Sequence, residues 1–275
     1  MITFSFGGLG LFLLCGTLLF SAAGRAENTG LVATPTGCTL IVSYPDGAIL
    51  RQEGDCTQRR APASTFKLPL AVMGFDSALL QDAHTPSIDY KDDYQSDMDI
   101  QKKTTDPTIW LKESIVWYSQ DLTRKMGMTA FQTYVRAFHY GNMDVTGNPG
   151  QNDGLTQSWL MSSLQISPQE QVAFVKNLLD CNLNVRLDAC NAAMAITPEF
   201  QAGDWRVFGK TGSGWLKDDQ GRIDKTKPQG WFIGWATKGE KTVIFAKLLL
   251  ENHPSKRYAG PKAKDAFLED LSHMD

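Results

Sequence analysis

Apolar residues recur along this chain with two different periods, and the change of period separates strands from helices. Within residues 38–54, strand-like segments lie on either side of the turn signal Pro45-Asp46-Gly47, which predicts a β-hairpin. Helical spacing then predicts helices over 68–80, 108–126, 129–138 and 168–181. The strand period returns near Trp205 and predicts strands over 206–211, 230–237 and 242–250, followed by a final helix over 261–272.

The order of these elements predicts the architecture. Strands from both ends of the sequence flank a helical insertion, which is typical of an α+β fold with an antiparallel sheet, flanking terminal helices and an inserted helical lobe. We expect the sheet lobe to contain residues of about 27–62 and 200–275, and the helical lobe residues of about 63–199. A cleft between two such lobes is a common place for a small-molecule site.

The N-terminal segment has a different character. Residues 4–20 are almost entirely apolar and small residues follow, so residues 1–26 are interpreted as a secretory signal peptide. Gly24-x-Ala26 fits cleavage before Glu27, Ser21-x-Ala23 is a second possible site, and a retained anchor is the competing interpretation. No later apolar run approaches membrane-spanning length. We therefore expect a soluble periplasmic protein with no membrane contact after cleavage, either a monomer or a homodimer.

Composition and cysteines narrow the class further. A net charge of −3, from 27 basic and 30 acidic residues, gives no reason to expect a nucleic-acid partner. Four cysteines remain after the signal, and the hairpin places Cys38 nearly opposite Cys56. A disulfide there would suit an oxidising compartment, and Cys181 and Cys190 could form a second. Four free thiols are the alternative, because four cysteines allow three pairings.

The first candidate for chemistry is Ser64-Thr65-Phe66-Lys67. Pro62 and the following apolar run predict a helix that starts near Ser64, and residues three apart share a helix face. The Lys67 amine can then reach the Ser64 hydroxyl. A lysine acts as a base only when burial lowers its pKa, and Phe66 and Leu68 supply apolar neighbours. By itself the pattern is far more often found on a solvated helix face.

Other candidates follow along the chain, and each also has a structural interpretation. Lys210-Thr211-Gly212, at a predicted strand end and followed by Ser213, offers a cation and hydroxyls to a substrate carboxylate. Ser114-Ile115-Val116 places a second hydroxyl in the helical region. Tyr140-Gly141-Asn142 alone indicates a turn. Trp159 is interpreted as a core residue whose indole N–H needs a partner when buried.

The order and spacing of these motifs decide between the interpretations. The series S-x-x-K, S-x-V, Y-G-N and K-T-G resembles that of the class D, or oxacillinase-type, serine β-lactamases. Residues 127–138, Ile166-Ser167-Pro168 and Gln229-Gly230-Trp231-Phe232 extend the resemblance over essentially the whole mature chain. It implies the fold shared by serine β-lactamases and penicillin-binding proteins, a β-lactam substrate and hydrolysis that gives antibiotic resistance.

The resemblance also implies a role for each motif. Ser64 is expected to form the acyl-enzyme, and Lys67 to react with CO2 to give a carbamate that activates the deacylating water. Phe66 and Val116 would lie beside the carbamate, and the Trp159 N–H would hold it. Ser114 would pass a proton to the β-lactam nitrogen. Lys210 and Thr211 would bind the substrate carboxylate, and the backbone N–H groups of Ser64 and Ser213 would form the oxyanion hole. No metal or separate cofactor is implied, with CO2 or bicarbonate as the source of the carbamate.

One residue departs from the family pattern. Many members carry an arginine near the C-terminal helix, and a rough alignment places Lys264 there. Lysine keeps the charge but loses the two-pronged geometry. A penicillin-binding sensor or a D,D-peptidase of the same fold is the nearest rival function, and an unrelated secreted protein is the more distant one.

Overall fold

A computed structural model describes residues 37–94, 96 and 98–274, so the predicted signal peptide lies outside the described residues. The strands are β1 (Cys38–Tyr44), β2 (Ile49–Gly54), β3 (Glu199–Ala202), β4 (Trp205–Lys217), β5 (Ile223–Lys238) and β6 (Lys241–Leu250). The α-helices are α1 (Lys67–Asp76), α2 (Pro107–Glu113), α3 (Val116–Met126), α4 (Met128–Ala137), α5 (Gly154–Gln157), α6 (Pro168–Leu179), α7 (Leu187–Ala195) and α8 (Ala259–Ser272). Short 3₁₀ helices are η1 (Ala63–Phe66), η2 (Asp92–Tyr94) and η3 (Asp99–Gln101).

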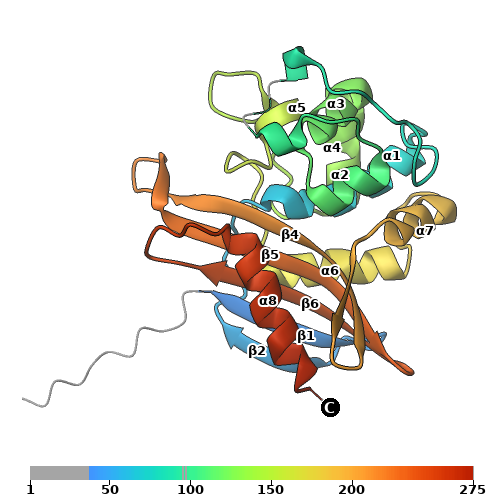
Figure 1. The fold of residues 1–275 in the computed structure, drawn as a ribbon, viewed down its shortest axis with the longest axis vertical. Helices are drawn as coiled ribbons and strands as arrows, with labels where there is room; N and C mark the ends of the chain where they lie inside the picture. The colour runs from blue at the N-terminus through green and yellow to red at the C-terminus, as the bar shows by residue number, and fades with distance from the viewer. Residues whose placement is uncertain (1–36, 95, 97, 275) are drawn as a thin grey trace, which may run out of the picture. The chain divides into compact units, whose positions relative to one another are not determined.

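The strands form one antiparallel sheet in the order β2-β1-β6-β5-β4-β3, with helices on both faces (Figure 1). Helix α8 crosses one face, where Phe267 stacks on Phe245 with ring centroids 3.9 Å apart. Helix α6 lies on the other face, towards the helices of the insertion (Figure 1). The predicted α+β fold with an antiparallel sheet and an inserted helical region is therefore confirmed. Every described residue belongs to one compact unit, 34–275.

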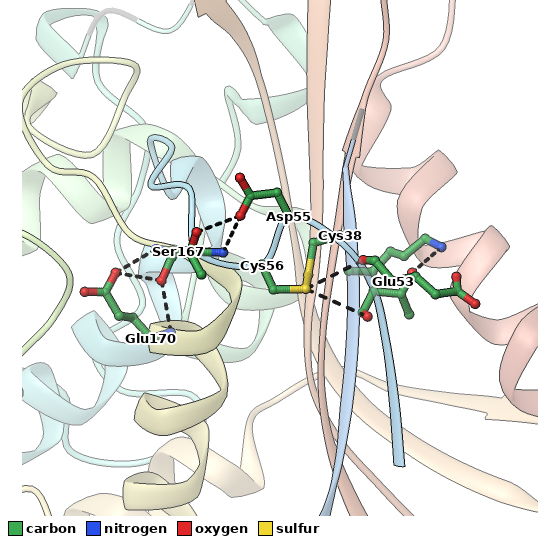
Figure 2. The surroundings of a disulfide bond; sticks show 9 residues. Cys38, Glu53, Asp55, Cys56, Ser167 and Glu170 are labelled. Carbon is green, nitrogen blue, oxygen red and sulfur yellow. Dashed lines mark hydrogen bonds between the residues drawn. A yellow bond between two sulfur atoms is a disulfide. The ribbon is translucent and has the colours of Figure 1, made fainter. Parts of the chain in front are cut away.

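The predicted hairpin is formed by β1 and β2, and it is closed by a disulfide. Cys38 pairs with Gly54 in the strand register, and the Cys38–Cys56 disulfide joins Cα atoms 5.2 Å apart. Figure 2 shows this bond near the start of α6, where Ser167 and Glu170 exchange the hydrogen bonds of a capping box. The Gln169 N–H donates to the Cys56 carbonyl at 3.2 Å, so the hairpin is tied to α6.

The second predicted disulfide also forms. Cys181 and Cys190 are joined across the short connection between α6 and α7, with Cα atoms 5.8 Å apart. The alternative of four free thiols is therefore wrong for this structure. Helix α7 itself was not expected from the sequence, because its alanines and single aspartate give little amphipathic contrast.

Two sequence expectations are corrected. The helix predicted over 108–126 is two helices, because Ser114 adopts a left-handed conformation with φ +62° and ends α2. Lys210-Thr211-Gly212 does not lie at a strand end, because β4 continues to Lys217. β3, which was also not expected, pairs with β4 only as far as Phe208. Beyond that residue, among the described strands, β4 is paired through β5 alone, so the motif lies along an open sheet edge.

No described helix has both the length and the apolar character needed to cross a membrane.

Candidate active site

Ser64 and Lys67 lie at the junction of η1 and α1, as the helix-face argument predicted. Lys67 Nζ lies 3.2 Å from Ser64 Oγ. Ser64 is partly exposed, whereas Lys67 is 1% exposed and is enclosed by the apolar start of α1. A ligand can therefore reach the hydroxyl, while the amine is held behind it in a dry environment.

The electrostatics of Lys67 follow from this burial. Desolvation, and then the nearby charge of Lys210, hold the pKa of the Lys67 amine well below its usual value. Burial therefore favours the neutral form of the Lys67 amine, whose free electron pair can accept a proton. An ordinary exposed lysine lacks this property.

A second lysine–serine pair lies near the first, since the charge of Lys210 acts on Lys67. Lys210 Nζ is 3.1 Å from Ser114 Oγ and 2.9 Å from the Thr211 carbonyl, and burial lowers the pKa of Lys210 to about 7. The left-handed turn at Ser114 places its hydroxyl where α2 ends, instead of along a continuous helix. The structure thus joins the S-x-V and K-T-G motifs, which are far apart in the sequence.

Along the open edge of β4, the backbone N–H groups of alternate residues point away from β5. The Gly209 N–H donates to the Pro198 carbonyl at 3.0 Å, on the side of β4 away from β5. Since N–H groups of alternate residues in a strand point the same way, those of Thr211 and Ser213 face the same open edge. A Cβ on Gly212 would lie 2.8 Å from the Pro62 carbonyl, which shows how closely η1 approaches this strand. Gly212 is thus required for close packing.

Trp159 and Phe66 form an apolar wall behind the nucleophile. Their rings stack with centroids 5.4 Å apart, both residues are fully buried, and the Trp159 carbonyl accepts the Ala63 N–H at 3.0 Å. Within residues 37–94, 96 and 98–274, the Trp159 indole N–H has no hydrogen-bond acceptor. Val116, the first residue of α3, is partly exposed.

Tyr140 of the Y-G-N motif supports the active site through a chain of buried hydrogen bonds. The Tyr140 hydroxyl donates to Gln171 Oε1 at 3.2 Å, and Gln171 Nε2 donates to Thr65 Oγ1 at 3.0 Å. Thr65 Oγ1 in turn donates to the Pro62 carbonyl at 2.7 Å, so this buried chain ends beside Ser64.

The two other residues of Y-G-N fix the following loop. Gly141 has φ +56°, and a Cβ there would meet the Gln165 carbonyl at 2.0 Å. Asn142 donates to the Ser163 carbonyl at 2.8 Å and accepts the Gln165 N–H at 2.9 Å. These contacts are structural, because they tie residues 140–142 to the segment that follows Trp159.

The candidate Lys264 is placed away from the two lysine–serine pairs. Its ammonium lies over the Phe200 ring, 4.7 Å from the centroid, and 3.3 Å from Asp265 Oδ1. The start of α8 approaches the K-T-G strand instead, since the Gly260 N–H donates to Ser213 Oγ at 2.9 Å. Arg257, which precedes that helix and pairs with Asp265, is an exposed cation.

The sequence argument missed a residue that supports Ser114. Gln101, 6% exposed, accepts the Val116 N–H through Oε1 at 3.1 Å, and its carbonyl accepts the Trp117 indole N–H at 2.7 Å. It therefore caps α3 from the end of η3, because Ile115 at the cap position supplies no side-chain acceptor. Only the absence of a capping residue before α3 could have signalled this contact.

Comparisons with known proteins agree with this geometry. Residues 36–186 and 190–273 match the family described as "Penicillin binding protein transpeptidase domain". Beta-lactamase OXA-9 of Klebsiella pneumoniae is 45% identical over 236 residues, which cover 85% of this chain and 86% of that protein. Beta-lactamase OXA-1 of Escherichia coli is 31% identical over 274 residues, 96% of each chain. The crystal structure of OXA-427 class D beta-lactamase has a TM-score of 0.80 at 40% identity, covering 86% of this chain and 97% of that chain.

The fold, the two lysine–serine pairs and the match to the family model all indicate the same class. It is that of serine-dependent proteins with the penicillin-binding-protein transpeptidase fold. Within that fold, the two relatives and the 40% identical structure are β-lactamases, and the structure is a class D enzyme. The chain belongs to the class D β-lactamases. Its substrate class is accordingly the β-lactams.

Proposed function

We propose that this enzyme hydrolyses penicillins, oxacillin-type β-lactams and some cephalosporins through an acyl-enzyme on Ser64, which water then cleaves with a carbamylated Lys67 as base. Such turnover would give antibiotic resistance. One observation carries the proposal: the buried amine of Lys67, whose pKa is lowered by desolvation, lies 3.2 Å from the Ser64 hydroxyl. Nucleophile and base are within reach of each other before any substrate binds.

The acylation step uses both lysine–serine pairs. Ser64 Oγ bonds to the β-lactam carbonyl carbon, its proton passes to the base at Lys67, and the ring C–N bond breaks. The ring nitrogen takes the proton of the Ser114 hydroxyl, and Ser114 regains one from the protonated base at Lys67, so the proton removed from Ser64 ends on the ring nitrogen. The backbone N–H groups of Ser64 and Ser213 are proposed to stabilise the oxyanion, since the N–H of Ser213 faces the open edge of β4.

The surroundings of Lys67 suit a carbamate. CO2 reacts with a neutral amine, and burial favours that form. The Trp159 N–H is a donor that needs an acceptor, and Phe66 supplies an apolar wall, with Val116 expected to add to it. When bound, the carbamate supplies an anionic base for water. Activity should therefore rise with added bicarbonate, and Lys67→Met should lack the carbamate ¹³C NMR signal that wild type shows with labelled bicarbonate.

The substrate carboxylate is assigned to Lys210 and Thr211, with Arg257 in the place where Lys264 was expected. Arg257 precedes the first turn of α8, which contacts Ser213, whereas the Lys264 ammonium lies over the Phe200 ring. A guanidinium also offers the two-pronged geometry that suits a carboxylate.

Export to the periplasm completes the proposal. The two disulfides require an oxidising compartment, and the predicted signal peptide would direct the chain to one. A monomer or homodimer is expected, without nucleic acid or a membrane as partner.

The decisive experiment counts benzylpenicillin molecules consumed per molecule of purified mature enzyme in bicarbonate buffer, with Ser64→Ala as control. Sustained turnover far beyond one equivalent, abolished in Ser64→Ala, supports the proposal. Consumption that stops near one equivalent would make the chain a penicillin-binding sensor or D,D-peptidase of the same fold. Activity that persists in Ser64→Ala would remove Ser64 from the mechanism.

A further inference from the structure

Helix α8 begins directly against the K-T-G strand. The Gly260 N–H, in the first turn of α8, donates to Ser213 Oγ at 2.9 Å. A Cβ on Gly260 would lie 2.5 Å from the Gly212 carbonyl oxygen and 2.6 Å from Ser213 Oγ, so only glycine allows this approach. Tyr258, at the cap position of α8, makes no side-chain cap bond. The Ser213 hydroxyl therefore caps α8 from another element.

The side chains of Thr211 and Ser213 lie on the same face of β4, because successive side chains of a strand point to opposite faces. A Cβ on Gly212, between them, would point towards η1 and meet the Pro62 carbonyl oxygen at 2.8 Å, whereas Ser213 Oγ meets α8. Thr211 and Ser213 are both partly exposed. Ser213 thus presents its backbone N–H at the open edge of β4, and its hydroxyl on the same face as the hydroxyl of Thr211.

The Ser213 hydroxyl keeps a proton that it can donate to a ligand. A serine hydroxyl has one proton and two lone pairs. One lone pair accepts the Gly260 N–H, and the proton has no acceptor in the part of the chain that the structure describes. The N–H groups in the first turn of a helix carry a partial positive charge, and a hydroxyl that accepts one of them is polarised by it. The Ser213 hydroxyl is therefore suited to donate to an anion.

We propose that the Ser213 hydroxyl donates a hydrogen bond to the ring carboxylate of the bound β-lactam. This inference rests on the proposed function, which assigns that carboxylate to Lys210 and Thr211 and the reacting carbonyl oxygen to the N–H of Ser213. One residue then binds two groups of the substrate: its N–H binds the carbonyl oxygen, and its O–H binds the carboxylate. Because the hydroxyl keeps its bond to Gly260, the positive end of α8 acts on the carboxylate through Ser213.

Benzylpenicillin and its methyl ester test the proposal, because they differ only by methylation of the ring carboxylate. The quantity to measure is the ratio of kcat/KM for the acid to that for the ester. The ratio should fall about tenfold in Ser213→Ala, the size expected for one hydrogen bond to a charged group. Ser213→Thr keeps a hydroxyl and should keep the ratio near its wild-type value. Ser272→Ala removes a hydroxyl at the other end of α8, where it donates to the Glu269 carbonyl, and should affect neither substrate.

The ester separates the proposed contact from a purely structural role. Ser213→Ala also removes the acceptor of the Gly260 N–H, and any displacement of α8 or of the Ser213 N–H should lower kcat/KM for the acid and the ester by the same factor. Only the loss of a bond to the carboxylate lowers the ratio. Thr211→Val is the positive control and should lower the same ratio, since the proposed function assigns Thr211 to the carboxylate.

A ratio that stays constant in Ser213→Ala would overturn the inference, whether or not both substrates lose activity, and so would an equal fall of the ratio in Ser272→Ala. A crystal structure of Ser64→Ala with bound benzylpenicillin tests the contact even if Ser213→Ala fails to fold. Ser213 Oγ should then lie within about 3 Å of a carboxylate oxygen, and a hydroxyl directed elsewhere would contradict the inference. A wild-type enzyme that is acylated without turnover would refute the proposed function alone, since the ratio can still be measured from acylation rates.

Discussion

Two buried lysines belong to the candidate active site, and their surroundings differ. Lys67, at the start of α1, has one hydrogen-bond partner among the described residues, the Ser64 hydroxyl. Lys210, in β4, contacts Ser114 Oγ and the Thr211 carbonyl. Burial lowers the pKa of both amines, but the charge of Lys210 lowers that of Lys67 further.

This comparison teaches that burial alone does not define a catalytic base. Lys67 is surrounded by apolar groups, which favour the neutral amine. Lys210 has polar partners that an ammonium group can bind, and a pKa of about 7 leaves it charged in part at neutral pH. The neutral amine is therefore suited to take a proton, and the partly charged one to receive a carboxylate.

The largest effect is expected from Lys67→Met, which keeps the apolar volume and removes the amine. Turnover of benzylpenicillin should fall by about a thousandfold or more, within the range for loss of a general base. The melting temperature should rise by about 2–4 °C, because a polar amine is removed from an apolar, buried position. Steady-state kinetics and thermal unfolding measure both. If the Lys67→Met enzyme kept its activity, Lys67 would not be the base, and the two lysines would not differ in the way proposed.

Stability should depend on pH through Lys210. Its folded pKa is about 7 against 10.5 for the unfolded chain, so between these values the unfolded state binds more protons. The unfolding free energy of wild type should therefore rise with pH from about 7 to 10, relative to Lys210→Met, by a few kcal/mol in total. Below pH 7 the difference should be constant. Urea unfolding at several pH values would show it, and parallel curves for the two proteins would contradict it.

A smaller effect is expected from Gln101→Met, which removes the cap of α3 and loosens the turn that places Ser114 against Lys210. We expect kcat to fall about fivefold with KM nearly unchanged, the kinetic equivalent of about 1 kcal/mol for a lost cap. Gln101→Glu keeps an acceptor and should restore most of the activity. A change in KM alone would show that Gln101 acts on substrate binding instead.

The smallest effect concerns the cation that assists Lys210. Arg257→Ala should lower kcat/KM for benzylpenicillin about threefold, mainly through KM, because an exposed ion pair contributes little. Lys264→Ala is the matched control and should change kcat/KM by less than the error of the assay. A larger loss of kcat/KM in Lys264→Ala than in Arg257→Ala would show that Lys264, and not Arg257, assists in binding the substrate carboxylate.

Local patterns predicted much of this molecule. The hairpin and its disulfide, the helix that opens at Ser167-Pro168 and the pairing of Ser64 with Lys67 all depend on residues close in sequence, for which spacing fixes direction. The break at Ser114 was not predicted. The apolar period continues through it, and the contact that supports it comes from Gln101 on another segment.

The sequence by itself indicated the family, placed Ser64 and Lys67 on one helix face and favoured both cysteine pairs. The tertiary structure decided that Ser114 contacts Lys210, 96 residues away in the sequence, and that K-T-G lies along the open edge of β4. It also decided that Lys264 lies over Phe200, and that Arg257 precedes the first turn of α8, which contacts Ser213. The physical reason is that helix and strand periods specify which face of an element is buried. They do not specify which distant element covers that face, because packing across the whole chain selects it.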